Sequence, residues 1–372
     1  MSSERPLRLL VVLGELHENG GVRVDLELAR QWNAAGASAR VFALRAARGP
    51  AASVDSTVSV RNGCRSQSRI RYAWPLILLR LIRGSHDSEV VISGSEIGLA
   101  LIFAFVAAHF TGRRFAVIVH SSLQGAMDSW TPLGLHSLTR FVHRHTDATS
   151  CVSQRLVPEL LAVGVRPQTI RVIPNGIDAD RVRKLAQQPP RLCISHDITV
   201  VAIGRLSPEK GFDVLIKAHA LVRQMGLEHR LVIIGEGPAR SELLQLACAL
   251  GVGDTIDMPG FQANPFPELA AADLFCMPSR YEGFPIALLE ALALGVPIVA
   301  SSCGGELLAD GAYGDLVAID SVDGLARAIE RHLRSPTRLR ATARLGPARA
   351  RLYAWPQIAD EYLRFLSGAQ PG

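Results

Sequence analysis

Two acidic residues flank a predicted helix start in the segment YEGFPIALLE. Glu282 stands first, Gly283-Phe284-Pro285 follow, and Glu290 lies eight positions after Glu282. Pro285 predicts the start of a helix, whose free N–H groups can hold a phosphate. Glu282 then lies in the loop and Glu290 about 1.5 turns inside the helix. Two carboxylates at different depths suit a polyhydroxy ligand such as a nucleotide sugar; the alternative for Glu290 is an exposed helix carboxylate.

Two cations occupy the turn between a predicted strand and a predicted helix in VVAIGRLSPEKGFDVLIKAH. The strand ends at Ile203 and the helix opens near Gly211, so Arg205 and Lys210 flank a helix N-terminus. That arrangement suits a diphosphate, because Arg offers a planar fork, Lys a mobile charge, and the helix dipole adds to both. Lys210 is one of three lysines against 37 arginines, which points to a requirement for an ammonium group. The alternative is a solvated charged loop.

The glycine-rich segment GEGPARSELLQLACALG also follows a predicted strand, and Pro238 is placed to start the next helix. Arg240 stands where the third glycine of the GxGxxG dinucleotide fingerprint belongs. The segment therefore argues against an NAD-dependent oxidoreductase.

Composition limits the class of protein. With 48% hydrophobic residues among 372, the chain is not disordered, and its length favours two domains. The longest apolar run, residues 97–108, is shorter than the ~20 residues that a spanning helix needs, so we expect a buried helix. Six cysteines without a CxxC pair favour reduced thiols and a cytoplasmic location.

Alternating apolar runs and helical periods predict two parallel-sheet series. The expected helices of the first series include Val22–Ala35, which ends at Gly36, and those of the second are Phe212–Met225, Ala239–Leu250, Phe266–Ala271 and Ile286–Leu294. The expected strands are Leu7–Leu13, Ala39–Leu44, Glu89–Ser93, Phe115–Val119, Ala148–Val152 and Arg171–Ile173, then Ile198–Ile203, Arg230–Ile234, Thr255–Met258, Leu274–Met277 and Pro297–Ala300.

These series predict two doubly wound α/β domains in tandem. We assign residues 1–178 to the first domain, 179–195 to a charged, Pro-containing linker, and 196–354 to the second domain. Residues 355–372 form a helix that we expect to pack back on the first domain. Ligands of such folds bind at the carboxyl ends of the strands, and we expect the crevice between the domains to hold them.

The combined motifs resemble retaining glycosyltransferases with the GT-B fold, in particular family 4. YEGFPIALLE is similar to the E-x7-E signature of that family, and Gly204-Arg205 with Glu209-Lys210-Gly211 to its diphosphate clamp. The resemblance continues through VIPNGID, GEGP, MPGF, AADLFCMPS and ALALGVPIVAS, and so covers the linker and nearly the whole second domain. It implies a GT-B fold, two tandem Rossmann-like domains facing a central cleft.

The resemblance also implies roles for single residues. Glu290 would bind the ribose hydroxyls, and Glu282 would lie by the transferred sugar. Gly283, Phe284 and Pro285 would form the loop beside the phosphates and the sugar. The family needs no metal or other cofactor, and Arg205 and Lys210 would supply the charge that a divalent ion supplies elsewhere. Glu306 in SSCGGELLADG would be a further donor-site carboxylate.

The first domain matches the family less densely. Gly20 and Gly21 in HENGGVRVDLELA resemble the Gly-Gly loop that approaches the diphosphate; a plain tight turn is the alternative. His120 follows the strand FAVIV, where many relatives have a histidine that contacts the donor sugar. The alternative for His120 is a structural histidine.

The implied reaction moves a hexose or N-acetylhexosamine from a nucleoside diphosphate, with UDP expected, to an acceptor hydroxyl with retained configuration. No protein nucleophile is required, because the departing phosphate takes the acceptor's proton. Two alternatives stay open: a non-catalytic nucleotide-sugar or glycan-binding protein, and a nucleotide-sugar epimerase on the same fold.

The net charge of +6 lies wholly in residues 1–180, where 20 arginines outnumber 14 acidic residues. A basic, apolar stretch at residues 61–83 contains Trp74 and LILLRLI, which favours an anionic membrane surface on the inner face of the cytoplasmic membrane. The acceptor would then be a lipid-linked glycan of polysaccharide or lipopolysaccharide assembly. The alternative is a solvated helix face, and no motif indicates nucleic acid. The arginines of this stretch are Arg61, Arg65, Arg69, Arg71, Arg80 and Arg83.

Overall fold

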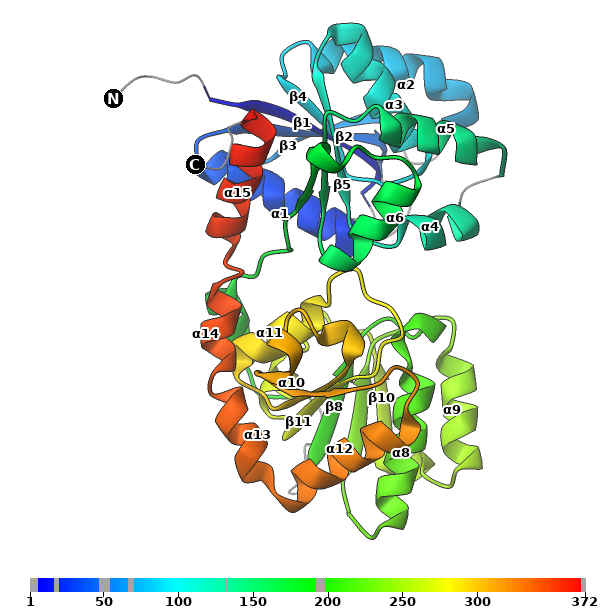
Figure 1. The fold of residues 1–372 in the computed structure, drawn as a ribbon, viewed down its shortest axis with the longest axis vertical. Coiled ribbons are helices and arrows are strands. Elements are labelled where there is room, and N and C mark those ends of the chain that lie inside the picture. The colour runs from blue at the N-terminus through cyan, green and yellow to red at the C-terminus, as the bar shows by residue number, and fades with distance from the viewer. Residues whose placement is uncertain are drawn as a thin grey trace. The chain divides into compact units, whose positions relative to one another are not determined.

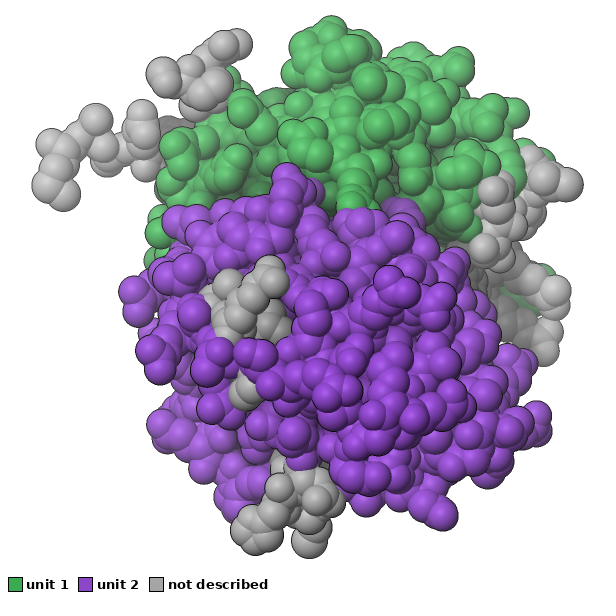
Figure 2. All heavy atoms as spheres, turned by 60° about the horizontal axis from the view of Figure 1, so that its bottom comes forward, with its two compact units in different colours: residues 1–176, 355–372 green, residues 177–354 purple. Residues whose placement is uncertain are grey.

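The chain forms two compact α/β units. The computed structural model describes residues 6–16, 20–46, 54–65, 70–130, 133–191 and 198–368. Unit 1 comprises residues 1–176 and 355–372, and unit 2 comprises residues 177–354 (Figure 1, Figure 2). The stretch predicted as a linker, 179–195, begins with a helix of unit 2, α7 (Ala179–Ala186), which packs against other helices of that unit. Residues 192–197 of the predicted linker lie outside the described residues.

Unit 1 is built on a parallel sheet, with seven strands among the described residues in the order β3-β2-β1-β4-β5-β6-β7. The apolar strands of its centre are buried, as expected for a sheet covered on both faces. The strands are β1 (Arg8–Glu15), β2 (Ser38–Arg45), β3 (Ser59–Cys64), β4 (Val90–Ser93), β5 (Arg114–Val119), β6 (Ala148–Cys151) and β7 (Ile170–Val172). The α-helices are α1 (Gly20–Ala34), α2 (Ile70–Ser85), α3 (Gly98–Thr111), α4 (Leu123–Trp130), α5 (Leu133–Arg144), α6 (Val157–Ala162) and α15 (Trp355–Ser367).

Unit 2 repeats the plan with a parallel sheet that has six strands among the described residues, in the order β10-β9-β8-β11-β12-β13. The strands are β8 (Thr199–Ile203), β9 (Arg230–Ile234), β10 (Ile256–Gly260), β11 (Leu274–Met277), β12 (Ile298–Ser301) and β13 (Asp315–Val317). Besides α7, the α-helices are α8 (Phe212–Gln224), α9 (Arg240–Ala249), α10 (Phe266–Ala270), α11 (Ile286–Leu294), α12 (Val322–Arg334), α13 (Pro336–Ala343) and α14 (Gly346–Arg351).

The strand order of each sheet places particular loops side by side. In unit 1 the order reverses between β1 and β4, and in unit 2 between β8 and β11. At such a reversal the loops after the two neighbouring strands leave in opposite directions and open a crevice at the carboxyl edge. In unit 2 these are the loops that contain Lys210 and Glu282.

Most predicted elements are confirmed. The bounds of β9, β11 and α11 agree with the prediction residue for residue, and the apolar run at 97–108 lies largely in α3. Two edge strands were missed: β3 carries exposed polar residues, and β13 has only three residues. No helix of the described residues combines the length and apolar character needed to cross a membrane.

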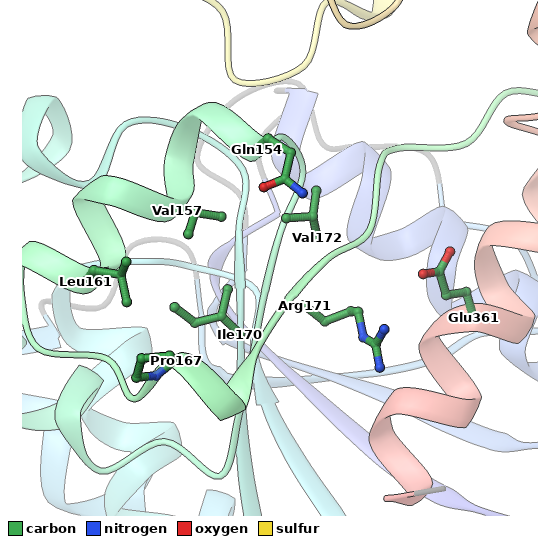
Figure 3. A pocket seen from close by; sticks show the side chains of 8 residues that line it. All are labelled: Gln154, Val157, Leu161, Pro167, Ile170, Arg171, Val172 and Glu361. Carbon is green, nitrogen blue, oxygen red and sulfur yellow. The ribbon is translucent and has the colours of Figure 1, made fainter. Parts of the chain in front are cut away.

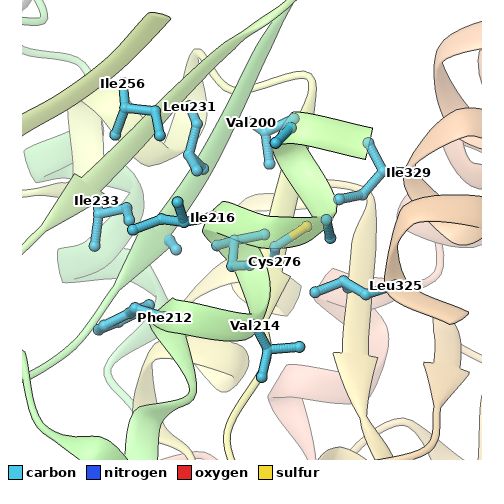
Figure 4. Packing of buried hydrophobic residues seen from close by; sticks show 14 of the residues in the cluster. Val200, Phe212, Val214, Ile216, Leu231, Ile233, Ile256, Cys276, Leu325 and Ile329 are labelled. Carbon is cyan, nitrogen blue, oxygen red and sulfur yellow. The ribbon is translucent and has the colours of Figure 1, made fainter. Parts of the chain in front are cut away.

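The core of unit 2 packs helix α8 against the sheet, with Phe212, Val214 and Ile216 among the buried residues (Figure 4). The same helix carries a buried histidine, His219, whose Nδ1 lies 2.8 Å from Nε2 of His229 and whose Nε2 lies 2.8 Å from Oγ1 of Thr255. Burial, with the nearby His229 and Arg223, lowers the pKa of His219 from 6.5 to about 3.

The buried histidine pair predicts that unit 2 loses stability in mild acid. The folded state keeps His219 neutral, whereas the unfolded chain takes up a proton near pH 6.5, so unfolding free energy falls as the pH drops from 6.5 toward 3. At pH 5 we expect a loss of about 2 kcal/mol relative to pH 8 from this residue. Urea unfolding at pH 5 and pH 8 measures the loss of unfolding free energy in the wild type and in His219→Gln. The loss should be smaller in His219→Gln.

His86→Gln is the control, because His86 is exposed on unit 1. An equal loss of unfolding free energy in His219→Gln and in the wild type would contradict the assignment.

Candidate functional site

Lys210 and Glu282 form an ion pair at the carboxyl edge of the unit 2 sheet. The Lys210 Nζ donates to both carboxylate oxygens of Glu282, at 2.8 Å each. Ser279 holds the same carboxylate, since its Oγ donates to Glu282 Oε1 at 2.6 Å. The Glu282 side chain is only 10% exposed and that of Lys210 24%. Two predicted site residues, 72 positions apart in sequence, therefore meet because β8 and β11 are neighbours.

The turn that presents Lys210 packs closely against the loop after β11. Pro208–Lys210 form a single 3-10 turn, and Gly211 follows with a φ of 66°. A Cβ on Gly211 would lie 2.2 Å from the Pro278 carbonyl oxygen, so both the conformation and the contact require glycine. Arg205 lies in the same loop with an exposed side chain, and it forms no ion pair with any described residue. Its guanidinium is thus available to an anion.

Helix α11 begins at Ile286, as predicted, and Pro285 is its N-cap residue. The Leu288 N–H donates to the Pro285 oxygen at 3.1 Å, whereas the N–H groups of Ile286 and Ala287 have no acceptor within the helix and can meet an anion. Phe284 is buried, and its ring centroid lies 5.9 Å from that of Tyr353. Glu290 sits on α11 and is half-buried. The loop of Gly283, Phe284 and Pro285 is therefore anchored through its aromatic residue.

The loop of Glu306 is held by an arginine from the end of unit 2. Arg349 on α14 donates to the backbone oxygens of Glu306, at 2.9 Å, and Leu307, at 3.1 Å. Its guanidinium also lies 5.5 Å from the Tyr313 ring and 5.3 Å from the Tyr353 ring. Glu306 itself is exposed. Its backbone is fixed, although its proposed role as a donor-site carboxylate stays a prediction.

In unit 1 the predicted glycines start a helix. Gly20 and Gly21 were predicted to lie in the loop before a helix that begins at Val22. Helix α1 begins at Gly20 instead, so both glycines belong to its first turn. A Cβ on Gly20 would meet no atom within 4 Å. Packing within the protein therefore does not require glycine there, and the position leaves space for a ligand.

His120 is bound to a buried acid that the sequence reasoning did not single out. The His120 Nε2 lies 3.0 Å from Oδ1 of Asp25, a fully buried residue of α1. The other Asp25 oxygen faces Gly94, where a Cβ would approach to 2.2 Å. Burial raises the pKa of Asp25, and the His120 contact offsets only part of that. Burial acts to lower the pKa of His120, but Asp25 and Glu96 outweigh it and the pKa is raised above 6.5.

A separate cavity of about 420 Å³ lies along the edge strand β7 of unit 1 (Figure 3). The predicted site residues do not line it, and it combines an apolar wall with three polar side chains. Its lining residues are Gln154, Val157, Leu161, Pro167, Ile170, Arg171, Val172 and Glu361.

Ser279, Arg280, Arg349 and Asp25 were missed as parts of the site. Ser279 and Arg280 carried a usable signal, because they lie in the loop that leaves the carboxyl end of the buried strand β11. Asp25 interrupts the apolar face of α1, which also marks it as unusual. Arg349 carried no sequence signal, since its role depends on how α14 packs.

Comparison with known proteins identifies similar chains for both units. The family model described as glycosyl transferases group 1 matches residues 197–335, and that of glycosyltransferase family 4 matches residues 18–181. The GDP-mannose-dependent alpha-(1-6)-phosphatidylinositol monomannoside mannosyltransferase of Mycolicibacterium smegmatis is 31% identical over 284 residues, 72% of this chain and 73% of its own. The enzyme of the same name from Mycobacterium tuberculosis is 31% identical over 325 residues, 82% and 83% of the two chains.

Solved structures show the same architecture. The crystal structure of Anabaena Alr3699/HepE in complex with UDP and glucose aligns with a TM-score of 0.80, at 20% identity, over 97% of this chain and 99% of that one. At this level of identity the likeness establishes the fold.

The Asp25–His120 contact predicts a measurable change in titration. Asp25→Asn keeps the shape and the hydrogen-bond acceptor but removes the charge, so we expect the pKa of His120 to fall, because burial then dominates. NMR titration of labelled histidine side chains measures this. His143 serves as the internal control, because it is also buried and contacts a backbone oxygen, that of Glu96. An unchanged His120 titration would show that Asp25 does not set its protonation.

Proposed function

This chain belongs to the family 4 glycosyltransferases of the GT-B fold, and from that premise we propose that it transfers a hexose or N-acetylhexosamine from a nucleoside diphosphate to a lipid-linked acceptor, with retained configuration. The observation that carries the proposal is the Lys210–Glu282 pair, which joins a cation suited to the diphosphate and a carboxylate suited to sugar hydroxyls. Arg205 and the N-terminus of α11 add positive charge to the same carboxyl edge.

In the proposed reaction the bond between the anomeric carbon and the diphosphate oxygen breaks, and a bond to the acceptor oxygen forms on the same face. The acceptor's proton moves to the departing phosphate, so no protein nucleophile is needed. Negative charge grows on the diphosphate as the bond lengthens. Lys210 and Arg205 stabilise that charge, the work that a divalent ion does in other transferases. Glu282 holds the Lys210 ammonium in place before the donor arrives.

The chemistry of the donor follows from its binding groups and from the relatives. Glu290 on α11 is proposed to bind the ribose, and His120 of unit 1 a sugar hydroxyl. The site residues themselves favour no particular nucleobase in the donor. From the sequence, the expected nucleotide is UDP. The mannosyltransferases of both mycobacterial species are named as GDP-mannose-dependent. GDP-mannose therefore stands beside the UDP-sugars as a proposed donor.

The experiment that tests this function has two steps. A thermal-shift screen of GDP-mannose, UDP-glucose and UDP-N-acetylglucosamine first identifies the donor, because a bound ligand stabilises the folded protein. The donor is then incubated with and without lipid-linked glycans, and released nucleotide and product are measured. Transfer supports the proposal. Donor binding without transfer to any acceptor points to a binding protein, and isomerisation without an acceptor to an epimerase; either contradicts it.

Lys210→Ala should lower turnover on the order of 100-fold or more, because the charge on the departing diphosphate loses its ammonium partner. Circular dichroism should remain that of the wild type, and the melting temperature should fall only modestly, because the Glu282 carboxylate loses its cation but keeps the hydrogen bond from Ser279. Lys184→Ala is the matched control, an exposed lysine on α7 that should leave turnover unchanged. Full activity in Lys210→Ala would contradict the proposed role.

An amphipathic surface on α2 supports the proposed lipid-linked acceptor. Tyr72, Leu76 and Leu79 are 70%, 49% and 44% exposed and recur at helical spacing on one face, while Ile77 and Leu81 are buried on the other. The exposed Arg80 and Arg83 extend the same face. Apolar side chains edged by arginines fit the interface of an anionic membrane. The mycobacterial relatives are named for a phosphatidylinositol acceptor, which is itself a lipid.

Sedimentation with vesicles tests this surface. Vesicles of phosphatidylglycerol and phosphatidylcholine should carry the wild-type protein down at low salt, and Leu76→Glu with Leu79→Glu should reduce the bound fraction several-fold, because carboxylates oppose both insertion and the anionic lipid. Leu244→Glu is the control, an equally exposed leucine (43%) on α9 of unit 2. Equal binding by both variants would place the contact elsewhere, and no binding by the wild type would exclude it.

A further inference from the structure

Arg280 joins three segments of unit 2 around the Lys210–Glu282 pair. Its Nη1 donates to the Pro208 carbonyl oxygen at 2.6 Å and to Asp213 Oδ1 at 2.8 Å, and its Nη2 donates to Asp213 Oδ2 at 2.8 Å. The third nitrogen, Nε, donates to Asp320 Oδ1 at 2.6 Å. One guanidinium thus reaches the loops after β8 and β13 from the loop after β11. Among the side chains, only that of arginine has donors enough in a fixed plane for this pattern.

These contacts lie on both sides of Lys210. Pro208 precedes it in the 3-10 turn, and Asp213 lies in the first turn of α8 just after it. The backbone adds to the same connection, because the Arg280 N–H donates to the Glu209 oxygen at 2.8 Å. Two residues after Arg280 comes Glu282, the partner of Lys210. Arg280 therefore fixes the turn of the cation to the loop of the carboxylate.

We propose that Arg280 is a positioning residue of the transferase: it sets the place of the Lys210 ammonium relative to Glu282 before the donor binds. This rests on the proposed function, since Lys210 and Glu282 act on the donor and Arg280 acts through them. Electrostatics agrees with the geometry, because the Arg280 contact is the main cause that lowers the pKa of Asp213. Fixed placement of charged groups matters for rate, because misplacement by about 1 Å can cost on the order of 100-fold.

Unit 2 offers a matched arginine outside the site. Arg230 donates from Nε and Nη2 to Asp257 Oδ2, at 3.2 and 2.7 Å, and the side chains of Arg230 and Arg280 are both 31% exposed. Arg230 starts β9, and so lies at the amino edge of the sheet, opposite the loops of Lys210 and Glu282. Arg230→Ala therefore also removes a partly exposed arginine–aspartate pair, but away from the site; Arg280 makes further contacts, with Asp320 and the Pro208 oxygen.

The test compares Arg280→Ala, Arg280→Lys and Arg230→Ala in donor affinity, kcat and melting temperature. We expect the kcat of Arg280→Ala to fall by 10- to 100-fold. Arg280→Lys should recover only part of the lost kcat. Arg230→Ala should keep the wild-type kcat, although its melting temperature is similar to that of Arg280→Ala. Guanidinium ion added at millimolar concentration should restore part of the activity of Arg280→Ala and none in Lys210→Ala. If Arg280→Ala does not fold, Asp213→Asn replaces it in the test. This variant removes the charge paired with Arg280, and its kcat should fall by a smaller factor.

Wild-type kcat in a folded Arg280→Ala would overturn the positioning role, as would an equal fall in Arg230→Ala or a fall that guanidinium does not reverse. These outcomes leave the proposed function intact, provided that the wild type transfers sugar. A wild type that neither binds a nucleotide sugar nor transfers one overturns the proposed function instead.

Discussion

The pairing of β8 with β11 is the constraint on which the site of unit 2 depends. These strands are neighbours in space although β9 and β10 come between them in sequence. Their carboxyl ends release two loops at one point of the sheet edge, and each loop brings one member of the Lys210–Glu282 pair. Hydrogen bonds of the sheet thus fix a contact between two long, flexible side chains that could not find a single arrangement by themselves.

The sequence located the strands and helices around the candidate site better in unit 2 than in unit 1. Buried strands such as Leu274–Met277 and the apolar helix Ile286–Leu294 are visible as runs and periods, so the loops between them could be placed. The contact of Lys210 with Glu282 could not be foreseen from spacing, because it depends on which strands pair. The Asp25–His120 pair was equally hidden, since α1 and β5 come together only in the folded sheet. Edge strand β3 was missed because its exposed residues lack a buried run.

The two arginines of this site, Arg280 and Arg205, differ in whether the protein itself occupies their guanidinium groups. The Arg280 guanidinium is committed to protein acceptors, namely Pro208, Asp213 and Asp320, whereas the Arg205 side chain has no ion-pair partner among the described residues. The first therefore stabilises the loops, and the second is available to an incoming anion. Two arginines at the same sheet edge, in the loops after β8 and β11, can differ in this way because their partners are set by the fold and not by the residue type.

The return of the chain to unit 1 has a consequence for the order of folding during synthesis. Unit 2 is one continuous segment, residues 177–354, whereas unit 1 lacks α15 until residues 355–367 have been made. The buried Tyr362 of that helix packs edge-on against the buried Trp32 of α1, with ring centroids 5.8 Å apart. The amino-terminal unit is therefore the later of the two to be completed on the ribosome, and until then it exposes an aromatic surface that chaperones can bind.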